Sequence, residues 1–287
     1  MPGFLVNRES MPELPEIAVI AKQMNQETVG KRIANVEIRQ PKILNMPVQE
    51  FVRTAEGKVV DSVSSKGKWL FVKLKQAYFL LINLGMGAEL LYFKPKDKLP
   101  EKTQFKLTFT DKTGFTIHFW WFGYTHLVAE KDLSEHKMTS VLGMSPMDKD
   151  FTLDYFEKLL ADKKTAVKNF LLDQKNVAGI GNVYVQDILF KARLHPSRKN
   201  MTLTGKELAA LYGAIREVLS QSIKLRGASF EVGFYGKKGR FTGDMFLVGY
   251  KPGKPCPTCG TTIEKIRTGS TASYICPDCQ RLESKER

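Results

Sequence analysis

The spacing of apolar residues divides the chain into a β-rich first part and a helical second part. A period of three to four residues from 14 to 29 predicts a helix that starts near Pro15 and ends at Gly30. Its apolar positions are Ile17, Ile20, Ala21 and Met24. Short runs of β-branched and aromatic residues follow, separated by turn signals. They predict strands at Val59–Val63, Trp69–Leu74, Tyr78–Asn83, Glu89–Phe93, Gln104–Phe109 and Phe115–Trp121.

Residues 127–151 are polar and weakly patterned, and we interpret them as a linker region. Helical patterns dominate beyond it, at Leu153–Ala161, Thr165–Asp173, Asn182–Ala192 and Gly205–Leu225. After Gly227, a loop rich in glycine, lysine and phenylalanine leads to a cysteine-containing tail. The pattern predicts an α+β multidomain protein: a helix with a β-sandwich or flattened barrel, then a helical domain, then a small terminal module.

Length and composition agree with this division. The 287 residues suffice for two ordinary domains and a small one, and 43% hydrophobic residues can form sizeable cores. No apolar run reaches membrane-spanning length, and the first ten residues lack the apolar segment of a secretory signal. We therefore expect a cytoplasmic protein.

The chain is strongly basic, with a formal net charge of +14. This charge favours a polyanionic partner, first of all nucleic acid, over a basic protein that binds no polyanion. The sequence has no basic amphipathic helix, which argues against a membrane surface.

The four cysteines form two C-x2-C pairs, Cys256 with Cys259 and Cys276 with Cys279, separated by sixteen residues. This spacing predicts one tetrahedral Zn²⁺ site with four thiolate ligands. Two disulfides or four unrelated buried thiols are the alternatives. The zinc prediction fits a reducing compartment. A zinc ribbon alone does not distinguish nucleic-acid binding, protein binding and a purely structural role.

Met11 is followed by Pro12 and Glu13 at the start of the first helix. Were Met11 the true start and removed, Pro12 would present a free secondary amine. An α-amino group titrates near ~8, so part of it is unprotonated at neutral pH and can attack a sugar C1′. Glu13 could shuttle protons beside it. The simpler interpretation is a helix start with acidic residues favourable to the helix dipole.

Two further motifs have a chemical and an ordinary interpretation. The glycines of Gly179-Ile180-Gly181-Asn182 allow a phosphate to approach backbone amides at a following helix, with Asn182 as a further donor. The ordinary interpretation is a corner between helices. Lys68, at a strand start, could bind phosphate or lie near a catalytic amine, although a solvated strand-end lysine is more common.

Taken together, the motifs resemble the formamidopyrimidine-DNA glycosylase and endonuclease VIII family. The resemblance rests on MPELPE from Met11, Lys66–Trp69, Leu84-Gly85-Met86, Lys163–Lys168, the Gly179–Asn182 turn, Leu194-His195-Pro196 and the four-cysteine ribbon ending in Gln280. Their order and spacing agree from residue 11 to residue 280. The resemblance implies a bifunctional base-excision repair enzyme that flips a damaged base from double-stranded DNA, cuts its glycosidic bond and cleaves the backbone by β- and δ-elimination.

The resemblance also implies residue roles. Pro12 is the expected nucleophile, Glu13 the proton shuttle and Lys68 a phosphate and proton-transfer residue. The expected DNA contacts are Lys164, Asn182 with the backbone of Gly179 and Gly181, the wedge methionine Met86, its aromatic partner Phe122, and Trp120 and Trp121 beside it. The implied domains are a catalytic β-sandwich at 12–135, a helix-two-turns-helix domain at 150–245 and a zinc-ribbon finger at 246–282. Family resemblance suggests a monomer, and the loop at Ala228–Gly239 is long, like the base-capping loop of the formamidopyrimidine branch.

The chain departs from the family pattern in several places. Ten residues precede Met11, and an amide nitrogen within the chain is not a nucleophile; we expect residues 1–11 to be an extension or a mis-assigned start. Trp120 and Trp121 replace two arginines, one that probes the base opposite the lesion and one that holds phosphate. The indoles can stack or wedge but cannot bind a base edge with two hydrogen bonds.

Two smaller departures follow. Thr271 replaces the ribbon arginine that grips phosphate, with Arg267 nearby, and Asn83 replaces a histidine. The ten-residue extension and the three missing arginines motivate a second hypothesis, a non-catalytic damaged-DNA-binding protein. A third hypothesis is a zinc ribbon on a protein-interaction module.

Overall fold

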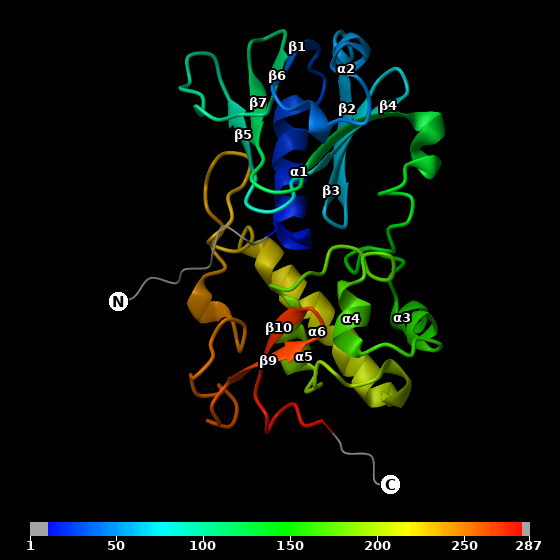
Figure 1. The fold of residues 1–287 in the computed structure, drawn as a ribbon, viewed down its shortest axis with the longest axis vertical. Helices are drawn as coiled ribbons and strands as arrows, with labels where there is room; N and C mark the ends of the chain where they lie inside the picture. The colour runs from blue at the N-terminus through cyan, green and yellow to red at the C-terminus, as the bar shows by residue number, and fades with distance from the viewer. Residues whose placement is uncertain (1–10, 283–287) are drawn as a thin grey trace. The chain divides into compact units, whose positions relative to one another are not determined.

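The computed structural model of the protein describes residues 11–282, which form two compact units (Figure 1). Unit 1 contains residues 11–141 and 225–240, and unit 2 contains residues 142–224 and 241–282. The chain therefore leaves unit 1, forms most of unit 2, returns to unit 1 and finishes in unit 2. The predicted helical domain at 150–245 includes residues 225–240, whereas the structure groups that segment with the N-terminal unit.

Helix α1 (Leu14–Thr28) confirms the helix predicted from the apolar period. Pro15 stands in its first turn, where the missing backbone N–H breaks no helical hydrogen bond. The helix ends before Gly30, whose positive φ of 82° suits glycine. All four apolar positions of the predicted stripe are buried.

Two four-stranded antiparallel sheets form the body of unit 1. One has the order β2-β3-β4-β8 and comprises Val60–Lys66, Trp69–Leu74, Tyr78–Asn83 and Tyr124–Ala129. The other has the order β1-β6-β7-β5 and comprises Ile33–Ile38, Phe105–Phe109, Gly114–His118 and Glu89–Phe93. Side chains from both sheets and α1 share one buried core, and Figure 1 shows α1 between the sheets in this view.

The structure corrects three predictions in unit 1. Strand β1 and helix α2 (Val48–Ala55) were not predicted, because β1 carries a bulge near Ile33 that interrupts its alternation and α2 buries only Phe51 and Ala55. Strand β8 and the short helix η2 (Glu130–Glu135) occupy part of the predicted linker. The predicted strand Phe115–Trp121 ends at His118, and a separate loop follows it.

Residues 225–240 are joined to unit 1 by side chains as well as backbone. Phe234 is fully buried in the unit 1 core, and its carbonyl accepts a hydrogen bond from the Tyr92 amide at 2.8 Å. Its own amide donates to Gln23 Oε1 at 2.8 Å, and the Tyr235 hydroxyl donates to Glu27 at 2.9 Å. This segment is therefore anchored along α1.

Unit 2 is mainly helical, as predicted. Its helices are α3 (Leu153–Leu160), α4 (Val167–Leu172), α5 (Val185–Lys191) and α6 (Gly205–Lys224), and its only strand pair in the described residues is β9 (Glu264–Thr268) with β10 (Thr271–Ile275). Short 3-10 helices lie at Pro41–Ile43 in unit 1 and at Asn200–Thr202 and Gly243–Met245 in unit 2. Across residues 11–282, no helix has the length and apolar character needed to span a membrane.

Candidate active site and nucleic-acid interface

The start of α1 is held by the carboxylate of Glu16. One oxygen of this carboxylate accepts the Glu13 backbone N–H at 2.9 Å, and the other accepts the Ala228 N–H at 2.9 Å. Gly227 lies so close that a Cβ there would stand 2.8 Å from the Glu16 carboxylate, and its φ is +84°. Pro12 and Glu13 are both buried. The residues expected to act as nucleophile and proton shuttle therefore stand directly before a well-anchored helix, with Glu13 as its N-cap.

Lys68 lies at the same end of unit 1 as Pro12. The Gly30 amide bonds to Val60 O, and the Val63 amide bonds to Asn25 Oδ1, so the helix runs antiparallel to β2. From Asn25 back toward Pro12, the chain therefore runs alongside β2 in the direction of the β2–β3 turn, with a helical rise of about 1.5 Å per residue. Lys68 stands in that turn and is half-buried.

Asn83 connects the β2–β3 turn, which contains Lys68, to the wedge motif Leu84-Gly85-Met86. Its Nδ2 donates to the Lys68 carbonyl at 3.1 Å, and its Oδ1 accepts the Gly85 amide at 3.1 Å. The residue that replaces the family histidine therefore fixes two loops by its own carboxamide. The replacement is visible in the sequence, whereas this role depends on the fold.

The strand order brings the wedge motif beside the loop between β7 and β8, residues 119–123, which we call the aromatic loop. Because β4 pairs with β8 and β5 pairs with β7, the connections β4–β5 and β7–β8 run side by side. Met86 and Trp121 exchange two backbone hydrogen bonds, of 2.9 and 3.2 Å. The expected wedge residues Met86 and Phe122 are thus brought together with Trp120 and Trp121 at one end of unit 1.

In unit 2, the Gly179–Asn182 turn is organised by two glutamine side chains. Gln174 accepts the Gly179 amide at 2.8 Å and donates to Ile180 O at 2.8 Å. Gln186 donates to Asn182 Oδ1 at 3.0 Å, which orients the Asn182 carboxamide. Helix α5 begins at Val185, three residues later than predicted, so Asn182 lies in the turn itself.

A buried lysine near this turn was not identified as a site residue from the sequence. Lys168, on α4, is fully buried, and its Nζ donates to Ala272 O and to Ser273 Oγ. Gln186 reaches the same strand, because its Oε1 accepts the Tyr274 amide at 3.1 Å. Burial lowers the pKa of Lys168 to about 8. By contrast, Lys164, the expected DNA contact, is exposed.

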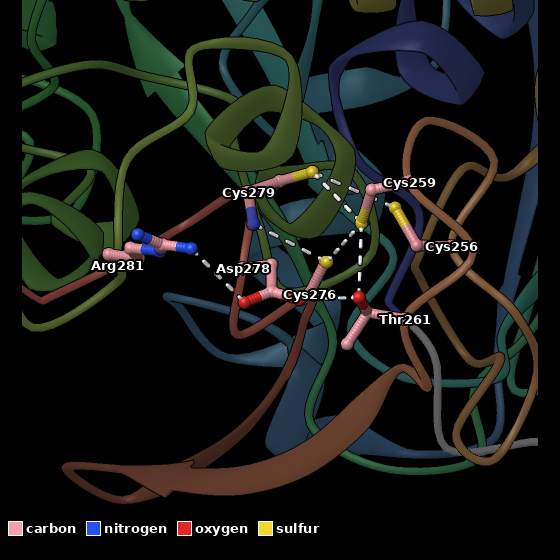
Figure 2. A network of polar contacts seen from close by, with 7 residues as sticks. All are labelled: Cys256, Cys259, Thr261, Cys276, Asp278, Cys279 and Arg281. Atoms are coloured by element: carbon pink, nitrogen blue, oxygen red, sulfur yellow. Dashed lines mark hydrogen bonds and ion pairs between the residues drawn. The ribbon is translucent and has the colours of Figure 1, made fainter.

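The four cysteines meet at one point, as the zinc prediction requires (Figure 2). All four Sγ atoms lie within 4.8 Å of one another, with Cys256–Cys279 at 3.9 Å and Cys259–Cys276 at 3.4 Å. Tetrahedral Zn–S bonds of ~2.3 Å place sulfurs ~3.8 Å apart, whereas a disulfide needs ~2.05 Å. The ligand set is therefore that of one structural zinc.

Thr271 and Arg267 lie on opposite strands of the ribbon hairpin. Thr271 pairs with Thr268 beside the turn, and Arg267 pairs with Ala272. The Arg267 Nε donates to the Gly269 carbonyl at 3.2 Å, and the side chain is exposed. Arg267 thus brings a guanidinium group to the hairpin turn from the strand opposite Thr271.

Three regions match family models: the formamidopyrimidine-DNA glycosylase N-terminal domain at residues 11–120, the formamidopyrimidine-DNA glycosylase H2TH domain at 142–233, and a zinc finger found in FPG and IleRS at 253–282. A formamidopyrimidine-DNA glycosylase of Streptococcus pneumoniae is 33% identical over 278 residues, covering 95% of this chain and 100% of the relative. This chain belongs to the formamidopyrimidine-DNA glycosylase family. A member from Pelotomaculum thermopropionicum is 34% identical over 279 residues, with the same coverage.

Solved structures of the family agree with this assignment. A Lactococcus lactis Fpg in complex with DNA containing an abasic site has a TM-score of 0.86 and 25% identity, covering 94% of this chain and 100% of that one. The same coverage and identity hold for the wild-type L. lactis Fpg bound to DNA with an N7-benzyl-Fapy-dG, with a TM-score of 0.87. The sandwich, helical domain and ribbon are those of a formamidopyrimidine-DNA glycosylase.

Proposed function

We propose that this chain is a base-excision repair DNA glycosylase with AP lyase activity, and that the amine of Pro12 forms an iminium with the damaged nucleotide. The observation that carries the proposal is the placement of Pro12 and Glu13 directly before α1, with Glu13 as its N-cap, at the end of unit 1 that also holds Lys68. Family-wide similarity supports the reaction class. It also supports DNA with a damaged base or an abasic site as the partner, bound by a monomer.

The reaction requires Pro12 to be the N-terminal residue. Its nitrogen, once free, attacks C1′ while the glycosidic bond breaks and the base leaves with a proton. Opening of the sugar then gives the iminium, and loss of a C2′ proton expels the 3′ phosphate. Glu13 is the proposed proton carrier. The family match begins at residue 11, which supports a functional start at Pro12.

The remaining site residues have binding roles in this proposal. Lys68 and Asn182 bind phosphates that flank the lesion, the second with help from the Gly179 and Gly181 backbone, and Lys164 adds an exposed positive charge. Met86 and Phe122 fill the space left by the flipped base. We place the enzyme at the nucleoid in the cytoplasm, where thiolate ligands stay reduced.

Borohydride trapping on a zinc-loaded chain starting at Pro12 tests the proposal. Duplexes bearing an oxidised base or an abasic site should give a covalent adduct. The Glu13→Gln variant, which keeps the amine, should trap at least about tenfold more slowly from the oxidised base. Absence of any adduct across a panel of lesions would contradict the proposal and support the non-catalytic damaged-DNA binder.

A further inference from the structure

Three consecutive aromatic side chains are exposed on the β7–β8 loop. Trp120, Trp121 and Phe122 are 51%, 57% and 66% exposed, whereas the remaining tryptophan, Trp69, is 4% exposed. The Trp121 and Phe122 ring centroids lie 5.8 Å apart. A contiguous apolar surface of this kind usually marks a binding site, because exposing it to water is unfavourable.

The backbone beneath these rings is fixed from the β7 side. Gln104 accepts the Phe119 amide at 2.8 Å and donates to the Phe119 carbonyl at 3.2 Å, so one side chain holds both polar groups of this residue. The Phe119 ring is buried against Gly123, where a Cβ would stand 1.9 Å from it. The aromatic loop is therefore fixed at both of its ends, at Phe119 after β7 and at Gly123 before β8.

The backbone is also fixed from the β4–β5 side. Phe122 has a φ of +46°, an uncommon value for a residue with a side chain, and its carbonyl lies where a Gly85 Cβ would approach to 1.5 Å. The paired backbones of Met86 and Trp121 complete the anchoring. The loop keeps a strained conformation while presenting three aromatic rings, which points to a surface preorganised for a partner.

The chemistry of the rings selects nucleobases as the occupant. Lys66 ends β2 and Lys68 stands in the β2–β3 turn at the same end of unit 1, and the whole chain has a formal net charge of +14, which together favour a polyanionic partner at this end. Aromatic rings stack on any base because every base has a π-face. Two indoles and a phenyl ring offer at most single N–H donors and no acceptors, so they lack the paired groups that distinguish one base edge from another.

We propose that Trp120 and Trp121, with Phe122, form a stacking surface that holds the unpaired base opposite the lesion whatever its identity. Family resemblance places Trp120 and Trp121 where relatives carry two arginines, one of which reads the base opposite the lesion. The inference particular to this chain is that stacking replaces that reading. The consequence for excision, which rests on the proposed function, is a repair activity with little dependence on the opposite base.

Tryptophan fluorescence tests the surface without requiring catalysis. The full 287-residue chain is titrated with duplexes holding a tetrahydrofuran abasic analogue opposite each of the four bases. Stacking should quench the emission of Trp120 and Trp121, and the four Kd values should agree within about threefold. Trp69→Phe, which removes only the buried indole, should leave the quenching unchanged.

Variants separate stacking from charge. Trp121→Ala should weaken binding by about tenfold or more for all four duplexes, by the same factor at low and high salt, while Trp121→Phe restores most of the affinity. Lys68→Ala should instead reduce the salt dependence. Met201→Ala, which truncates another exposed apolar side chain, 61% exposed, is the matched control and should bind normally.

Three results would overturn the inference: a tenfold or larger preference for one opposite base, binding unaffected by Trp121→Ala, or quenching that follows protein concentration alone, which would assign the surface to a second copy. The proposed function fails separately, by absence of borohydride trapping. Trapping can fail while base-independent quenching persists, and the reverse can also occur.

Discussion

At the scale of single residues, His126 and His136 form an acid-sensitive pair inside unit 1. His126 Nδ1 lies 2.9 Å from His136 Nε2, and both rings pack near Trp69. Burial, and secondarily the charge of His136, lowers the pKa of His126 to about 4, and burial also lowers that of His136. Both rings are therefore neutral in the folded protein at neutral pH.

This pair predicts a loss of stability in mild acid. The unfolded His126 titrates near ~6.5, so below that pH the unfolded state binds more protons than the folded state. The stabilisation is present above pH ~6.5 and is lost as pH falls through about 4, by up to about 3 kcal/mol. Urea unfolding between pH 7.5 and 4.5 measures it. His126→Asn should show a smaller loss, and an equal pH dependence in both proteins would contradict the assignment.

The four zinc-ligating cysteines were predictable from the sequence, because they belong to two short contiguous motifs. The roles of Pro12, Glu13 and Lys68 stay predictions. Partners supplied by distant segments were not predictable. Asn83 connects two loops, Lys168 contacts the ribbon strand, and Glu16 binds Ala228. Each of these contacts depends on tertiary packing that no local pattern records.

At the scale of elements, the regular strands were predicted well and the irregular ones were not. Strands β3, β4 and β5 agree at both ends with the prediction, because each is a short run rich in apolar and aromatic residues between turn signals. Strand β8 follows the loop Phe119–Gly123 directly and continues into the polar region that begins at residue 127, so its apolar run is short. Its identity is established by pairing with β4 along its whole length.

Segment 225–240 supplies a prediction about packing. Phe234 is fully buried among unit 1 residues, so Phe234→Ala should lower the free energy of unfolding by about 3–5 kcal/mol. Tyr235→Phe removes only the exposed hydrogen bond to Glu27 and should cost at most about 1 kcal/mol. Urea denaturation followed by circular dichroism compares the two. A loss below 1 kcal/mol for Phe234→Ala would show that the segment does not stabilise unit 1.

The zinc ribbon supplies a second prediction at this scale. Removing the metal leaves four cysteine side chains close together with no cation between them. It should unfold the hairpin β9–β10, since structural zinc sites contribute folding free energy. Hydrogen exchange after chelation should show loss of protection at Thr271–Ile275, with β3 and β4 of unit 1 still protected. Retained protection of the hairpin in the metal-free protein would contradict the zinc role.

At the scale of the whole molecule, the chain combines a strongly basic composition, a structural zinc site and a first helix preceded by Pro12-Glu13. Family membership explains why these features occur together. The departures then define what is particular to this chain: two tryptophans in place of arginines, a threonine in the ribbon hairpin, and ten residues before Met11. Only the last of these affects whether the proposed nucleophile exists.

The most direct measurement is to locate the borohydride-trapped DNA on the chain by proteolysis and mass spectrometry. The protein starting at Pro12 and the full 287-residue protein are compared on the same abasic duplex. The account predicts a strong adduct on the peptide beginning with Pro12 and little adduct from the full chain. An adduct on another residue, or equal trapping by both proteins, would contradict it.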